Sequence, residues 1–128
     1  MDLLSSSSNK PLRQRVDGAI IRKDFTKAVK DCGGDADAQA DSTVAMNQEL
    51  FDCNPKELYQ QTGAKRNQRA TLPHEAQKAL IVGETVATHD LKAANEAGEF
   101  EGSQPQVNQK IEGKVRESSK KVRKLFPW

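Results

Sequence analysis

The stretch PHEAQKALIVGETVATHDLKAANEAG, residues 73–98, decides the fold of this chain. Its apolar and small residues recur every three or four positions, which places them on one face of an α-helix. Pro73 favours the start of this helix and Gly98 its end. The stripe consists of Ala76, Leu80, Gly83, Ala87, Leu91 and Ala94. Because these residues are mostly small, another helix can approach closely, and we expect this segment to be the central helix of the core.

The first region of the chain combines a polar start with a helical pattern. Residues 1–10 hold a short apolar run and four serines, a composition that predicts a disordered tail. From Pro11, apolar residues recur at helical spacing, with a second start signal at Asp24. The pattern predicts either two short helices, about 11–22 and 24–32, or one kinked helix.

A glycine pair and an acidic stretch follow. The pair at 33–34 ends the first region. Residues 33–41 are acidic and small without an apolar period, which predicts a loop or a frayed helix end. Ser42 or Thr43 then caps a predicted helix that runs to about Asp52.

Two more helices have clear local signals. Asn54 as N-cap, Pro55 as first helical residue and Glu57 three positions after the cap predict a short helix that stops at Gly63. After a linker at 99–104, the last helix has the most regular apolar stripe: Val107, Ile111, Val115, Ser118, Val122 and Leu125. No run alternates long enough to predict a strand. The sequence predicts an all-α fold, a bundle of four to six helices forming a single domain over residues 11–126.

Composition suits a single small core. The chain has 128 residues and a net charge of +2, from 20 basic and 18 acidic residues. Summing side-chain charges gives +4 for residues 1–30, −6 for 31–57, +1 for 58–98 and +3 for 99–128. The overall charge neither predicts nor excludes nucleic-acid binding, but the distribution separates an acidic middle from basic ends.

The sequence gives no sign of membrane insertion or secretion. No apolar stretch approaches the roughly 20 residues that cross a bilayer, and Met1 is not followed by a signal-like region. We therefore expect a cytoplasmic protein without membrane contact. Cys32 and Cys53 lack paired spacing, which predicts reduced, buried thiols rather than a disulfide.

Sequence motifs of catalysis and cofactor binding are missing. His74 and His89 lie on the central helix without a nucleophile elbow elsewhere, and no glycine-rich phosphate loop occurs. The two histidines and two cysteines are too widely spaced for a zinc site. We expect a non-enzymatic protein with no catalytic residues, no cofactor and no metal.

Two groups of cations are candidates for phosphate contact. The loop after Gly63 carries Lys65, Arg66 and Arg69, and the last helix carries Lys110, Lys114, Arg116, Lys120, Lys121, Arg123 and Lys124. Such side chains bind nucleic acid by releasing condensed counterions. The connection between the two flanking helices is too long for a helix-turn-helix motif. The leading hypothesis is a small regulatory protein that binds nucleic acid or a nucleic-acid-processing protein.

A protein-binding module is the alternative hypothesis. The acidic segment 31–57 and the terminal sequence LFPW, with Phe126 and Trp128, could contact a protein partner. The amphipathic last helix could also close the chain's own core or pair with its copy in a homodimer.

Residues 46–91, MNQELFDCNPKELYQQTGAKRNQRATLPHEAQKALIVGETVATHDL, resemble a helical module of the DNA-damage-inducible protein D and phage antirepressor (Bro and KilA-like) group. The matching positions are Leu58, Tyr59, Gly63, Arg69, Leu72, Gln77, Ala79 and Glu84. The resemblance covers about a third of the chain and lacks the larger domains that accompany the module in that group. It implies a regulatory protein of a mobile-element or DNA-damage setting that acts through DNA or DNA-processing proteins.

Overall fold

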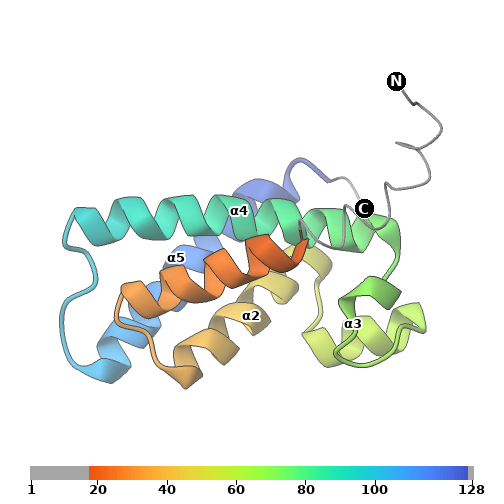
Figure 1. Cartoon of the computed structure of the whole chain (residues 1–128), viewed down its shortest axis with the longest axis horizontal. Coiled ribbons are helices and arrows are strands. Elements are labelled where there is room, and N and C mark those ends of the chain that lie inside the picture. The colour runs from red at the N-terminus through yellow and green to blue at the C-terminus, as the bar shows by residue number, and fades with distance from the viewer. Residues whose placement is uncertain (1–17, 127–128) are drawn as a thin grey trace.

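The computed structural model describes residues 18–126 and shows an all-α bundle (Figure 1). The first helix covers the described residues 18–31, and the later elements are α2 (Ala36–Phe51), α3 (Pro55–Thr62), the 3-10 turn η1 (Arg69–Thr71), α4 (His74–Glu96) and α5 (Gln104–Arg123). Within residues 18–126 there is no strand. The predicted tail and the predicted helix start at Pro11 lie outside the described residues.

Helix α4 spans the length of the molecule, as the central-helix prediction requires (Figure 1). The first helix and α2 lie along one side of it, and α5 packs against both α2 and α4. Helix α3 and the loop that follows it lie at one end, beside the start of α4. This arrangement leaves α3 and its loop separate from α5.

The predicted stripe of α4 forms the centre of the core. All six of its residues are buried, from Ala76 to Ala94. A Cβ built on Gly83 would stand 3.1 Å from both the Leu50 side chain and the Met46 sulfur. The prediction of close helix approach is therefore confirmed, with α2 as the helix that approaches.

One predicted boundary is wrong, and one alternative that the sequence left open is decided. Helix α2 begins at Ala36, inside the predicted loop, because Asp35 caps it by accepting a 3.1 Å hydrogen bond from the Ala38 N–H, and Ala38 is fully buried. The first helix continues through Asp24 to residue 31, so the described part shows one helix and no second start at Asp24. Asp24 is exposed, and the turn after it buries Phe25 and Ala28 without a break.

The local stop and start signals are confirmed elsewhere. Gly33, at φ 94°, ends the first helix. The Asn54 side chain accepts from the Glu57 N–H at 2.8 Å, and the Glu57 carboxylate accepts from the Asn54 N–H at 3.2 Å. Gly63 ends α3 at φ 73°. These caps fix the direction in which the chain enters and leaves α3.

Helix α5 closes the core of the molecule. Its predicted stripe is buried from Val107 to Val122, and Ser119 is fully buried beside it. The prediction that Leu125 belongs to this stripe is wrong, because the helix ends at Arg123 and Leu125 is 70% exposed. The alternative in which α5 closes the chain's own core is therefore the observed one.

Candidate functional site

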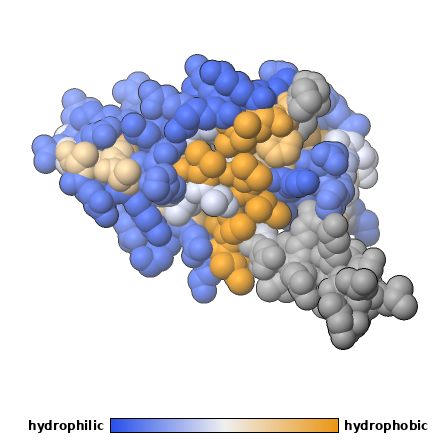
Figure 2. Space-filling model, turned by 90° about the horizontal axis from the view of Figure 1, so that it is seen from above, coloured by the Kyte–Doolittle hydropathy of each residue, from blue (hydrophilic) through white to orange (hydrophobic). Residues whose placement is uncertain are grey.

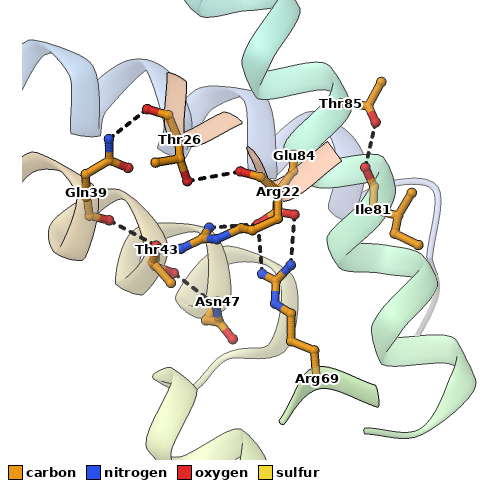
Figure 3. Close-up of polar contacts among 9 residues, drawn as sticks. All are labelled: Arg22, Thr26, Gln39, Thr43, Asn47, Arg69, Ile81, Glu84 and Thr85. Carbon is orange, nitrogen blue, oxygen red and sulfur yellow. Dashed lines mark hydrogen bonds and ion pairs between the residues drawn. The ribbon is translucent and has the colours of Figure 1, made fainter. Parts of the chain in front are cut away.

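A buried ion-pair cluster lies where the first helix, α4 and the loop after α3 meet (Figure 3). Glu84 on α4 is fully buried. Arg69 donates to both of its oxygens, at 2.9 and 2.8 Å, and Arg22 donates to Oε2 at 2.8 Å. Two arginines against one carboxylate leave the cluster with a net charge of +1. Such pairing offsets the cost of removing the carboxylate from water.

Arg22 is held by two further contacts. Its Nη2 donates to the Thr43 hydroxyl on α2 at 2.9 Å, and its guanidinium lies 5.5 Å from the centre of the Phe25 ring. The Arg22 and Arg69 side chains are each about one-third exposed, at 33% and 32%. Both arginine side chains are therefore anchored by the cluster and only partly covered by the protein.

Hydrogen bonds and one buried leucine hold the loop between α3 and α4 in place. The Lys65 N–H donates to the Thr71 hydroxyl at 2.8 Å, and that hydroxyl donates to the Gln68 carbonyl at 2.6 Å. Leu72 is buried in the core, and the Gln77 side chain donates to its carbonyl at 2.8 Å. These contacts position the loop cations.

A cationic groove of about 770 Å³ opens between α2, α3 and this loop. It is lined by Arg22, Ala36, Gln39, Ala40, Thr43, Val44, Gln48, Asn54, Pro55, Lys56, Tyr59, Arg66 and Asn67. Three of these residues are cations, and none is acidic. Lys56 and Arg66 are exposed, and their side chains have no ion pair within residues 18–126. An anion in this groove would meet positive charge and neutral hydrogen-bonding groups.

Tyr59 supplies an aromatic wall of the groove. The side chain is only 9% exposed. Burial raises the pKa of the Tyr59 phenol, against the opposite influence of Arg69 and Arg22. The phenol therefore stays neutral at physiological pH, as a hydrogen-bonding group rather than an anion.

The structure separates the three predicted loop cations. Arg69 forms an ion pair with the buried Glu84. Lys65 and Arg66 are exposed and make no ion pair with the described residues. Only Arg66 lines the cationic groove. The loop therefore offers fewer charges to a ligand than its sequence suggests.

Most cations of α5 have partners. The ion pairs are Arg116 with Glu49 at 2.7 Å, Lys121 with Asp90 at 2.8 Å, Arg123 with Asp52 at 3.1 Å, and Lys114 with Glu99 and Glu117 at 3.4 and 3.5 Å. Lys110 donates to the Glu101 carbonyl at 2.7 Å. Lys120 and Lys124 are exposed and have no ion pair in the described chain. Carboxylates of α2, α4 and neighbouring segments thus neutralise much of the predicted basic face.

The structure describes only one of the two predicted partner-binding residues, Phe126 and Trp128. Phe126 is partly buried and packs against the core. Trp128 lies outside the described residues. Leu125 is the exposed apolar side chain at this end of α5.

Arg22 and Lys56 line the groove but were not among the predicted site residues, because neither lies in the loop after Gly63 or in the last helix. The role of Glu84 in a buried ion pair was not predicted either. Glu84 follows Gly83 on the apolar stripe of α4, and an acidic residue beside a buried helix stripe is a readable signal for a buried ion pair. Arg22 lies 62 positions before Glu84, so no local pattern links the two.

Other expected features can be placed. Cys32 and Cys53 are free and buried, as predicted, and His74 and His89 are exposed on α4. The described residues contain no cluster of three or more side chains suited to a metal ion. In the same part of the chain, no helix has the length and apolar character to cross a bilayer.

No family model, curated protein or solved structure matches the chain.

Proposed function

We propose that this chain is a non-enzymatic protein that binds nucleic acid through phosphate contacts in the cationic groove. The observation that carries the proposal is the composition of the groove wall, with Arg22, Lys56 and Arg66 and no acidic side chain. A nucleic-acid backbone needs this combination, because each phosphate neutralised by Lys or Arg releases counterions and adds affinity.

The neutral side chains of the groove suit contacts beyond the backbone. Gln48 and Asn67 line it, and amide side chains can donate to and accept from base edges. Asn67 has a left-handed backbone, at φ 61°, and follows the exposed Arg66 directly. The turn thus presents a cation and an amide together at the groove.

The second part of the proposed surface consists of the lysines of the last helix and its end that make no ion pair with described residues. Lys120 and Lys124 are exposed, and Lys110 donates to a carbonyl oxygen rather than to a carboxylate. These lysines lie on or just after α5, which packs against α2 and α4, and would add phosphate contacts beyond those of the groove. The groove is the primary site, and the regulatory setting implied by the resemblance remains a prediction.

Fluorescence anisotropy with a labelled oligonucleotide, single-stranded and duplex, tests the proposal. The variant Lys56→Gln with Arg66→Gln should weaken binding at least about tenfold at low salt, because two phosphate contacts are lost. It should also make the salt slope shallower by about 1.4 to 1.8. The matched control, Lys23→Gln with Lys92→Gln, removes two exposed charges outside the groove and should bind almost as the parent does. No binding by the parent at about 50 mM salt would refute the proposal.

A protein-binding function is the second candidate, and one observation favours it. Figure 2 shows apolar residues gathered in a continuous area on the α4 side of the molecule. Ile20 of the first helix is 54% exposed and Leu125 is 70% exposed. Affinity capture from a native extract, with and without nuclease, separates the candidates. A partner that is retained after nuclease treatment supports direct protein contact.

A further inference from the structure

A second hollow, the apolar pocket, shares Arg22 with the cationic groove and also has Arg69 in its wall. It has a volume of about 310 Å³ and is lined by Gly18, Ala19, Arg22, Arg69, Ala70, Gln77, Leu80 and Ile81. Figure 3 shows Arg22 and Arg69 converging on Glu84, with Ile81 on the same helix as Glu84. The volume falls within the range of small-molecule sites, about 300–1,000 Å³.

The pocket combines an apolar wall with two anchored cations. Leu80 and Ile81 of α4, with Ala19 and Ala70, supply the apolar side chains. The cations among its lining residues are Arg22 and Arg69, and it contains no acidic residue. Sites of this kind use the apolar wall for affinity and a few polar groups for orientation.

The charge balance favours a ligand with one negative charge. Glu84 neutralises one of the two arginines, which leaves +1 beside the pocket. Each guanidinium has five N–H donors and uses two in its hydrogen bonds to described residues. The remaining donors of Arg22 and Arg69 make no hydrogen bond to a described residue, both residues line the pocket, and both are already held in place. Little ordering is therefore needed when an anion binds.

We propose that the apolar pocket binds a small amphiphile with a single carboxylate and a short aliphatic chain. The carboxylate accepts hydrogen bonds from the guanidinium N–H groups, which match its planar geometry. The aliphatic chain covers Leu80 and Ile81 and is removed from water. This site shares Arg22 with the cationic groove, but its binding is measured without nucleic acid, so the two proposals can fail independently.

Octanoate, titrated into the full chain by calorimetry and by amide NMR, is the test. We expect saturable binding with shifts at the Gly18 and Ala70 amides. Octanol keeps the aliphatic chain without the charge, and acetate keeps the charge without the chain. Each should bind at least about tenfold more weakly than octanoate, because octanol lacks the carboxylate and acetate lacks the aliphatic chain.

Two variants locate the site. Ala70→Trp and Ala19→Phe each place a large side chain at an exposed position on the pocket wall, without removing a core residue. Both should abolish octanoate binding. Ala93→Trp, at an exposed position of α4 outside the pocket, is the control and should bind as the parent does.

The proposal fails if octanoate shows no saturable binding with a Kd of about 1 mM or tighter. It also fails if octanol binds as well as octanoate, or if the filled variants still bind. The blocked peptide Asp-Leu-Leu carries the same charge and apolar groups on a polypeptide. Binding of this peptide without binding of octanoate would replace the small-molecule proposal with a protein partner.

Discussion

Arg69 forms a two-point ion pair with Glu84, fifteen positions later in the chain, with N···O distances of 2.9 and 2.8 Å. This pair joins the loop after α3 to the middle of α4. Arg69, which the sequence predicts as a phosphate contact, therefore holds the loop against α4 instead. The loop cation left to meet a ligand in the groove is Arg66.

Glu84→Gln should lower the free energy of unfolding by about 3–5 kcal/mol, because it leaves two partly buried arginines without their counter-charge. Glu75→Gln, at an exposed position of the same helix, is the control and should change stability by less than about 0.5 kcal/mol. Urea unfolding followed by circular dichroism measures both. Equal stability of the two variants would show that the buried pair contributes little.

Helix α5 offers a matched test of core packing. Ile111 is fully buried and Leu125 is 70% exposed, although both belong to the stripe read from the sequence. Ile111→Ala should cost about 2–5 kcal/mol, and Leu125→Ala should cost little. Thermal unfolding of the two variants measures the difference. A large loss for Leu125→Ala would place that side chain in a packed interface, such as a homodimer.

Asp90 should make stability depend on acid. Burial alone would raise its pKa, but hydrogen bonds from Lys121 and Ser118 outweigh burial and hold the pKa below its usual 3.8. The folded state therefore binds the proton less readily than the unfolded state, so Asp90 stabilises the fold above about pH 3.8. That contribution is lost as the pH falls through the lowered folded pKa.

Asp90→Asn should accordingly flatten the dependence of unfolding free energy on pH in the acid range. Glu96→Gln, exposed on the same helix, is the control and should leave the pH profile almost parallel to that of the parent. Urea unfolding at a series of pH values below 5 gives the comparison. An unchanged profile for Asp90→Asn would show that the contacts with Lys121 and Ser118 are not formed in solution.

The two thiols should be unreactive in the native protein. Cys32 and Cys53 are 5% and 6% exposed, and burial raises the pKa of both, that of Cys32 to about 11. Because the thiolate is the reactive form, Ellman's reagent at pH 8 should react only after urea is added. Leu125→Cys supplies an exposed thiol that should react at once. Rapid reaction of both native thiols would indicate frequent opening of the core.

Much of the fold could be predicted because its signals are local. The α4 stripe, the Asn54 cap and the Gly63 stop each depend on residues a few positions apart. The start of α2 was missed because Asp and Ala alternate there without large apolar residues. Ala38 is nevertheless fully buried, so tertiary packing decided an ambiguous sequence.

The candidate site was predicted only in part, because its charges are arranged by distant contacts. Arg66 could be identified as an exposed loop cation, whereas the loss of Arg69 to Glu84 depends on how the loop packs on α4. Arg116 pairs with Glu49, 67 positions earlier. A charge run in sequence does not show which of its members meet carboxylates across the bundle.

Amide NMR of the full chain with a short oligonucleotide tests the central claim most directly, because it shows where the ligand binds. We expect salt-sensitive shifts at Lys56, Arg66 and Asn67, with the largest changes around the cationic groove. Shifts confined to the Lys120 and Lys124 face of α5, or no shifts at low salt, would contradict it.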